Sequence, residues 1–161
     1  MSAPEIYFED LPAGRTIELG TAVVDRDEML AFNRRFDPQP FHLDEEAGRA
    51  SMLGGLCASG WFTASLWMRC YVDGVLSRAA SLGSPGGDEI AWPAPVYPGD
   101  RLDAAMEIVA ARTSRSRPEV GLITLTGTLT REDTAVFRAR FTGMFGRRRP
   151  DGPGVAASDP A

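Results

Sequence analysis

The chain has 161 residues and a formal charge of −5, from 22 acidic and 17 basic residues. This length favours one domain with one hydrophobic core. The acidic balance argues against nucleic-acid binding, which depends on clustered Lys and Arg. All the basic residues are arginine, so lysine Schiff-base and lysine general-base chemistry are excluded.

The cysteines and the apolar runs predict a cytoplasmic protein. Cys57 and Cys70 are the only cysteines, which are too few for a disulfide-stapled secreted domain. The first residues lack the pattern of a signal peptide, and no apolar run reaches the roughly 18 residues of a membrane span. We therefore expect no membrane partner. With one histidine and no close cysteine pair, no metal site is expected, and only a site made of carboxylates is left open.

The first part of the chain predicts a strand and a helix. Residues 15–24 carry β-branched side chains that favour a strand. Asp25 offers a helix N-cap, with Glu28 three residues later, and predicts a helix over 26–36. The apolar residues expected on one face of this helix are Met29, Phe32 and Phe36.

Two prolines in three residues predict a rigid corner after this helix. Pro38 ends the helix and leaves Asp37 extended at its exit, because the residue before a proline is pushed out of the helical region. Pro40 continues the corner. Asp44 can then cap a second, short helix that ends near Ala50.

The segment from Gly60 to Leu76 predicts a buried helix. Apolar side chains cover nearly all of its surface, and a helix of this kind is buried on most sides. Its large side chains are therefore expected in the core rather than around a ligand. They include Trp61, Trp67 and Met68.

The rest of the chain changes to an apolar period of two. A loop over 81–87 comes first, and a disordered tail is predicted over 147–161, which leaves one domain over 1–146. Half-buried antiparallel strands are predicted over 88–92, 101–112, 123–130 and 136–145.

Together these elements predict an α+β hot-dog fold, in which a curved antiparallel β-sheet wraps a long central helix. The concave face of the sheet then buries the apolar helix. Because such a sheet leaves strand edges that commonly pair between subunits, we expect at least a homodimer.

His42 is the only histidine, and it is the first candidate for proton transfer. Imidazole titrates near neutrality, with an unperturbed pKa of about 6.5. Asp37 precedes His42 by five residues across the proline corner, so the two side chains are expected close together. The alternative is that a lone histidine beside a turn is only a packed or solvated residue.

The run from Asp37 to His42, with Ser59 and Gly60 at the head of the buried helix, resembles the hydratase motif of the MaoC-like, (R)-specific enoyl-CoA hydratase family. The family motif has an aspartate, a proline three residues later and a histidine two further on. These positions match Asp37, Pro40 and His42.

The resemblance covers roughly residues 7–146 and includes the turn at 95–100 before a long strand. The family often has glycine, asparagine and histidine at three positions where this chain differs. The residues that stand there are Phe36, Gln39 and Ser59.

The resemblance implies that Asp37 and His42 are a catalytic dyad that holds one water against an acyl-CoA thioester. No metal and no separate cofactor are expected. The N–H groups of the first helical turn are suited to stabilise the thioester oxygen, and Gly60 lets a substrate approach closely. The alternative is that Ser59 is an N-cap and Gly60 a packing glycine.

Three further arginines are candidates for the phosphates of coenzyme A, because arginine binds phosphate with two parallel hydrogen bonds. The alternative is a solvated turn. They are Arg112, Arg115 and Arg117.

The chemistry that these residues imply is hydration of a 2-enoyl-CoA to the (R)-3-hydroxyacyl-CoA, or the reverse dehydration. Two other functions are left open: a hot-dog acyl-CoA thioesterase, and a non-catalytic acyl-thioester binding or assembly subunit. Free coenzyme A would be released only by the thioesterase. Cys57 is a poor nucleophile, since no second histidine exists to activate it.

Overall fold

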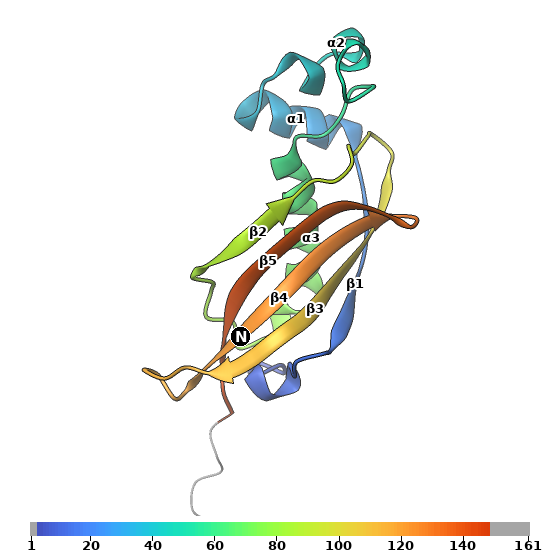
Figure 1. Ribbon diagram of the computed structural model, residues 1–161. Helices are drawn as coiled ribbons and strands as arrows, with labels where there is room; N and C mark the ends of the chain where they lie inside the picture. Colours follow the sequence, from blue (N-terminus) through green and yellow to red (C-terminus); the bar gives the residue numbers. More distant parts are fainter. Residues whose placement is uncertain (1–2, 149–161) are drawn as a thin grey trace, which may run out of the picture.

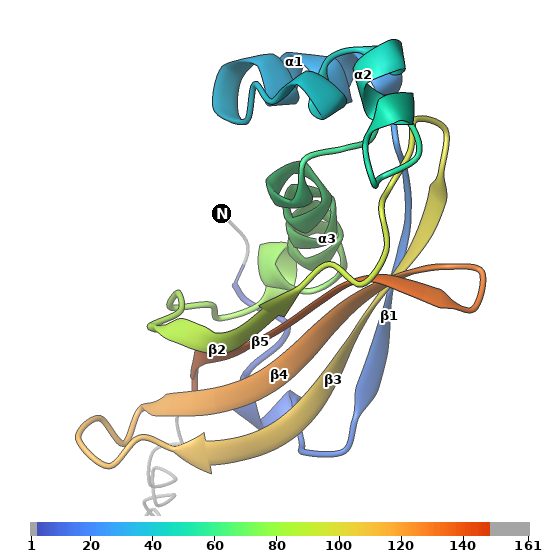
Figure 2. The same ribbon diagram turned by 45° about the horizontal axis from the view of Figure 1, so that its top comes forward.

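A five-stranded antiparallel sheet curls around one long helix in the computed structural model, which describes residues 3–148 (Figures 1 and 2). Helix α3 (Gly60–Gly74) lies against the concave face of the sheet. The predicted hot-dog arrangement is therefore confirmed. The strands are β1 (Thr16–Val23), β2 (Gly86–Ala91), β3 (Arg101–Thr113), β4 (Val120–Arg131) and β5 (Thr134–Gly146), in the order β1-β3-β4-β5-β2 across the sheet.

The alternation of buried and exposed side chains along the strands changes where the register shifts. On β3 the predicted inward residues are buried as far as Ile108, after which a shift in the β3–β4 register leaves Ala110 exposed. A shift after Leu129 explains why Val136 is fully buried, although the predicted period of two over 136–145 would place it on the face opposite Phe137. An extra residue in one strand moves the following side chains to the other face.

Helix α1 (Arg26–Phe36) has the predicted bounds. The Asp25 carboxylate accepts a hydrogen bond from the Glu28 N–H at 2.8 Å, which is the predicted N-cap. The predicted apolar face is wrong toward the helix end, because Phe36 is 61% exposed where the helix projects past the core. The buried residues are Met29, Leu30 and Asn33.

The remaining helical elements are short. A second helix follows the Asp44 cap, as predicted, and with α1 it lies beyond the N-terminal end of α3 (Figure 1). These elements are α2 (Glu45–Ala50) and the 3-10 turns η1 (Phe8–Asp10), η2 (Pro40–His42) and η3 (Leu76–Arg78).

Helix α3 is buried on one side only. Trp67 belongs to the core, as predicted, and its indole N–H donates to the Ala105 carbonyl at 3.0 Å. Trp61 and Met68 were also predicted in the core, but they are 58% and 44% exposed. The sheet of a single chain covers only part of the helix surface, so these two side chains face outward.

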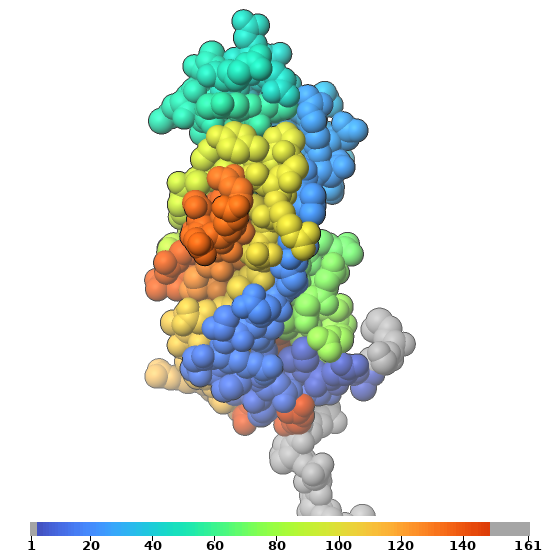
Figure 3. Space-filling model, turned by 90° about the vertical axis from the view of Figure 1, so that its right-hand side faces the viewer, coloured from blue at the N-terminus to red at the C-terminus, as the bar shows by residue number. Residues whose placement is uncertain are grey.

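Ion pairs hold Arg147 and Arg148, the first two residues of the predicted C-terminal tail. Arg148 pairs with both carboxylate oxygens of Asp10, at 2.7 and 2.8 Å, and Arg147 pairs with Glu9 at 3.3 Å. These pairs hold the end of β5 beside η1, at the end of the molecule opposite α2 (Figure 3). The rest of the predicted tail, 149–161, lies outside the described residues.

Candidate active site

The proline corner brings Asp37 and His42 together. Asp37 leaves α1 with φ −148° and ψ 64°, while its N–H still donates to the Asn33 carbonyl at 2.9 Å. The chain then turns back, since the Gln39 N–H donates to the Asp37 carbonyl at 2.8 Å. His42 Nε2 lies 3.5 Å from Asp37 Oδ2. The two side chains singled out by their spacing in sequence are therefore neighbours in space.

The ring of His42 is buried and oriented by the backbone. His42 Nδ1 lies 2.9 Å from the Cys57 carbonyl oxygen, which can only accept, so the geometry assigns a hydrogen to Nδ1. In the neutral ring, Nε2 then directs a lone pair toward Asp37. Two acceptors that face each other suit a donor that bridges them. A water molecule, with two hydrogens, is such a donor.

The surroundings of Asp37 keep it ionised. Partial burial acts to raise its pKa, but hydrogen bonds from Ser59 Oγ to Oδ2 and from Gln39 Nε2 to Oδ1, each 2.7 Å, outweigh burial. The proximity of His42 also acts to lower the pKa, and the net pKa is below the ordinary value for aspartate. Gln39 and Ser59, two of the departures from the family motif, therefore both hold this carboxylate.

Asn33 is a buried residue of the site that we did not predict. Its Nδ2 donates to the His42 carbonyl at 2.9 Å and to the Cys57 carbonyl at 3.4 Å, and its Oδ1 accepts from the Ser59 N–H at 3.2 Å. One fully buried side chain thus joins α1 to η2 and to the segment before α3. A signal existed in the sequence, since Asn33 follows Met29 by four residues and so lies on the apolar face.

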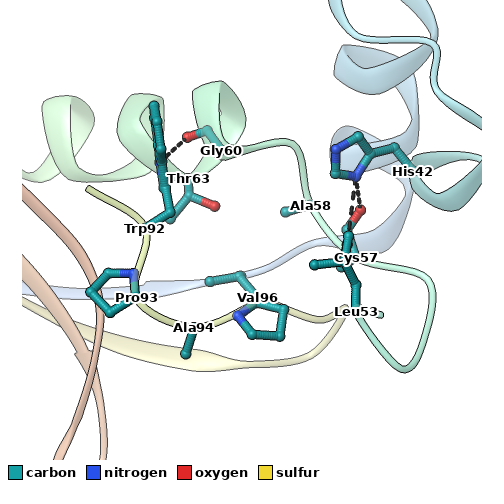
Figure 4. Close-up of a pocket in the computed structure, with 11 residues that line it drawn as sticks. His42, Leu53, Cys57, Ala58, Gly60, Thr63, Trp92, Pro93, Ala94 and Val96 are labelled. Carbon is teal, nitrogen blue, oxygen red and sulfur yellow. Dashed lines mark hydrogen bonds between the residues drawn. The ribbon is translucent and has the colours of Figure 1, made fainter. Parts of the chain in front are cut away.

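A cavity of about 330 Å³ lies between His42 and the first turn of α3 (Figure 4). His42 and Cys57 stand on one side of it, and Gly60 and Thr63 stand on the other. This volume falls within the range of small-molecule sites. The remaining lining is mostly apolar and consists of Leu53, Ala58, Trp92, Pro93, Ala94, Pro95 and Val96.

The head of α3 contributes Gly60 to the cavity lining, whereas Ser59 is fully buried. Ser59 Oγ donates to Asp37 and accepts from the Trp61 N–H at 3.3 Å, so the hydroxyl is an N-cap and a support for the carboxylate. A Cβ on Gly60 would lie only 2.7 Å from Cε2 of Trp92. Glycine is thus required here for close packing of the indole as well as for an open approach to the helix.

Cys57 lines the cavity but has little nucleophilic character. Burial raises the pKa of its thiol, and the negative charge of Asp37 raises the pKa further. The thiol is therefore protonated at neutral pH, and the thiolate is the reactive form. Cys57 and Cys70 are both free and buried.

The three arginines considered for coenzyme A phosphates lie away from this cavity. They are exposed and sit in or beside the β3–β4 turn. Figure 2 shows this turn at the opposite end of the sheet from α1. Within one chain, the structure does not bring together Asp37 and His42 with Arg112, Arg115 and Arg117.

Neither a metal cluster nor a membrane span is found within residues 3–148. In this part of the chain no three His, Cys, Asp or Glu side chains are grouped to hold a metal ion. None of its helices is long and apolar enough to cross a membrane.

Comparison with known proteins shows that most of the chain matches one protein family. The profile of the MaoC-like domain matches residues 10–131. A crystal structure of a MaoC-like dehydratase from Rhodospirillum rubrum is 36% identical, with a TM-score of 0.82, over 90% of this chain and 99% of that one.

More distant relatives extend the similarity. The uncharacterised protein YdeM of Bacillus subtilis (strain 168) is 24% identical over 141 residues, which is 87% of this chain and 99% of YdeM. The (R)-hydratase of A. caviae involved in PHA biosynthesis is 21% identical, with a TM-score of 0.67, over 86% of this chain and 99% of that one. At this identity, the hydratase shows a shared fold.

Proposed function

Because this chain belongs to the MaoC-like domain family, we propose that it is a hydratase/dehydratase that interconverts a 2-enoyl-CoA and the (R)-3-hydroxyacyl-CoA. One observation carries the proposal: His42 Nε2 and Asp37 Oδ2 lie 3.5 Å apart beside a cavity large enough for the reacting end of an acyl thioester. The 36% identity to a protein described as a MaoC-like dehydratase supports the reaction class. The (R)-hydratase neighbour is the source of the expected stereochemistry.

The proposed reaction begins with a water that donates one hydrogen to Asp37 Oδ2 and the other to His42 Nε2. Its oxygen then directs a lone pair at Cβ of the substrate. As the C–O bond forms at Cβ, the Asp37–His42 dyad removes one proton from the water. The electrons of the double bond move through Cα onto the thioester oxygen. The Asp37–His42 dyad then returns this proton to Cα, so atoms and charge balance. A positioned acid or base of this kind contributes about 10²- to 10⁴-fold to the rate.

The negative charge on the thioester oxygen needs donors that are already oriented. In the first turn of α3 the Trp61 N–H donates to the Ser59 cap, but the other N–H groups of this turn have no partner within the helix, and the helix dipole favours an anion there. Gly60 lines the cavity at this turn and lies across the cavity from His42. We therefore assign the oxyanion site to this turn. The reaction has no net oxidation, so the proposal includes no redox cofactor. It includes no metal because the proposed dyad and the helix N–H groups already supply the proton transfers and the oxyanion donors.

The proposed functional unit is a homodimer. Strand β2 is at the edge of the sheet, and exposed apolar side chains occur on β2, directly after it and on α3. Edge strands and apolar patches of this kind are typical of subunit contacts. The exposed residues are Trp61, Met68, Ile90 and Trp92. Sedimentation equilibrium of the full chain tests this part of the proposal.

The test of the reaction is incubation with crotonyl-CoA, with the loss of the conjugated enoyl absorbance and the release of thiol followed together. We expect absorbance loss without thiol, and chiral analysis of the product to give the (R)-3-hydroxy isomer. Thiol release would instead support the thioesterase. Absence of both signals with crotonyl-CoA and with longer, branched and dicarboxylic enoyl-CoAs would favour the binding subunit.

A further inference from the structure

Two cavities lie next to each other along one face of α3. The first is the cavity beside His42, to which α3 contributes Gly60 and Thr63. The second has a volume of about 340 Å³ and begins at Ala64, one turn further along the helix. Its walls are largely apolar and come mainly from α3 and β5. The large side chains among them are Trp67, Met68, Tyr71, Phe137, Phe141 and Phe145.

Trp92 stands at the boundary between these cavities. Its indole lines the first cavity, and its Nε1–H donates to the Gly60 carbonyl at 2.7 Å (Figure 4). The centre of its ring lies 6.5 Å from that of Phe137, which lines the second cavity. Trp61 packs edge-on against Trp92, with ring centres 5.3 Å apart. The indole is thus fixed by one hydrogen bond and by two aromatic neighbours.

We infer that Trp92 is a specificity-determining residue that closes the catalytic cavity against the apolar cavity along α3, and so restricts the enzyme to short acyl chains. The inference rests on the proposed function, because it concerns the acyl group of that thioester. An acyl chain attached to a thioester at the head of α3 has to pass the indole before it can enter the second cavity. The second cavity has the apolar walls that an alkyl chain requires.

The test is the substitution Trp92→Ala in the full chain, with chain length as the variable. The turnover of crotonyl-CoA and of trans-2-decenoyl-CoA is measured for both proteins. Each methylene that becomes buried strengthens binding by roughly fourfold. The ratio of kcat/KM for decenoyl-CoA over crotonyl-CoA should therefore rise by about tenfold or more in the variant.

Two further variants test whether the change in chain-length ratio comes from removal of the Trp92 indole itself or from a less rigid active site. Trp61→Ala removes one aromatic neighbour of Trp92 but no residue that lines either cavity, so it should change the chain-length ratio far less than Trp92→Ala does. Adding Ala64→Leu to Trp92→Ala partly fills the second cavity and should return the ratio toward that of the wild type. Circular dichroism and sedimentation of each variant establish that the fold and the assembly are retained.

A binding measurement distinguishes failure of this inference from failure of the proposed function. Butanoyl-CoA and decanoyl-CoA cannot be hydrated, so calorimetry with them reports on acyl binding alone. The expected result is that wild type binds butanoyl-CoA and that Trp92→Ala gains affinity for decanoyl-CoA. Binding of butanoyl-CoA with no gain for decanoyl-CoA in the variant would overturn the gate. Absence of butanoyl-CoA binding to the wild type would count against the proposed substrate class.

Discussion

Asn33 Nδ2 lies 2.9 Å from the carbonyl oxygen of His42, so a buried amide on α1 holds the backbone of the residue that carries the imidazole. The same amide accepts from the Ser59 N–H through its oxygen. Ser59 in turn donates to Asp37. The positions of both members of the proposed dyad therefore depend on one side chain that does not itself line the cavity.

Replacement of Asn33 by Leu should destabilise the fold and lower activity together. The change removes the partner of the His42 carbonyl and of the buried Ser59 N–H, while the Cys57 carbonyl keeps His42 Nδ1, and each buried group left without a partner costs about 1–3 kcal/mol. We expect a loss of roughly 2–4 kcal/mol in the free energy of unfolding, measured by urea denaturation. Arg34→Ala, at an exposed neighbour on α1, is the control. If Asn33→Leu were as stable as the control, the hydrogen bonds of Asn33 would not contribute to the free energy of unfolding.

Asp37→Asn and His42→Ala should each lower kcat by about 10²- to 10⁴-fold, since each removes one holder of the proposed water. Steady-state kinetics with crotonyl-CoA measures the effect. The exposed Asp27 on the same helix provides the matched control Asp27→Asn, which should retain full activity. Retention of the wild-type kcat in either dyad variant would exclude that residue from the chemistry.

Ser59→Ala should move the acid limb of the kcat/KM profile to higher pH. The Ser59 hydroxyl is one of the hydrogen-bond donors that lower the pKa of Asp37, and its removal lets that pKa rise. Asp37 is active as the carboxylate, so activity is then lost at a higher pH than in the wild type. Ser59→Thr retains a hydroxyl and should keep the limb near its original position. A limb that does not move in Ser59→Ala would mean that another group sets it.

The lowered pKa of Asp37 also predicts how the free energy of unfolding depends on pH. In the unfolded chain the pKa of Asp37 is near the ordinary 3.8, and in the folded chain it is lower. The contribution of ionised Asp37 to the free energy of unfolding is therefore complete above the unfolded pKa and is lost as pH falls through the folded pKa. The difference in unfolding free energy between wild type and Asp37→Asn should therefore shrink between about pH 5 and pH 2. Urea denaturation at several pH values measures it. A difference that does not change over this range would contradict the assignment.

Gly60→Ala should lower activity, and Trp92→Ala should partly restore it in the double variant. The Cβ of alanine would lie 2.7 Å from the Trp92 indole, so one of the two groups has to shift. A shifted indole or helix terminus would change the head of α3, where we assign the oxyanion site. A double-mutant cycle on kcat measures the coupling between the two positions. Additive effects would place the cause of the loss elsewhere than in this contact.

Cys57 and Cys70 should react slowly with iodoacetamide in the folded protein. Both thiols are buried, and burial raises the pKa of each, so the reactive thiolate is scarce at neutral pH. Mass spectrometry with and without urea compares the folded and unfolded rates. Cys57→Ser should remain active. Rapid labelling of Cys57 without urea would mean that the cavity wall opens readily.

Local sequence patterns predicted most of the elements, because the chemistry that defines them is local. The Asp25 cap, Pro38 and the period-two runs determine where α1 and the strands begin and end, and the approach of Asp37 to His42 depends on only six consecutive residues. The register shifts that bury Val136 and expose Ala110 could not be predicted in this way. They depend on how two strands pair, and no single strand encodes that pairing.

The parts of the site that come from distant segments were also missed. Trp92 reaches the head of α3 from the end of β2, and Asn33 connects three segments that are separate in the sequence. Trp61 and Met68 were misassigned to the core for a related reason. An apolar helix side chain indicates burial against some surface, but it does not say whether that surface belongs to the same chain.

The ion pairs of Glu9 and Asp10 with Arg147 and Arg148 bring the two ends of the described chain together, at the end of the molecule opposite α2. This arrangement suits circular permutation. A linker that joins residue 148 to residue 3 would close the chain there, and the chain would be reopened at the exposed β3–β4 turn without interrupting a strand. For the same reason, a reporter domain fused directly after Arg148 would sit at the end of the molecule opposite α2.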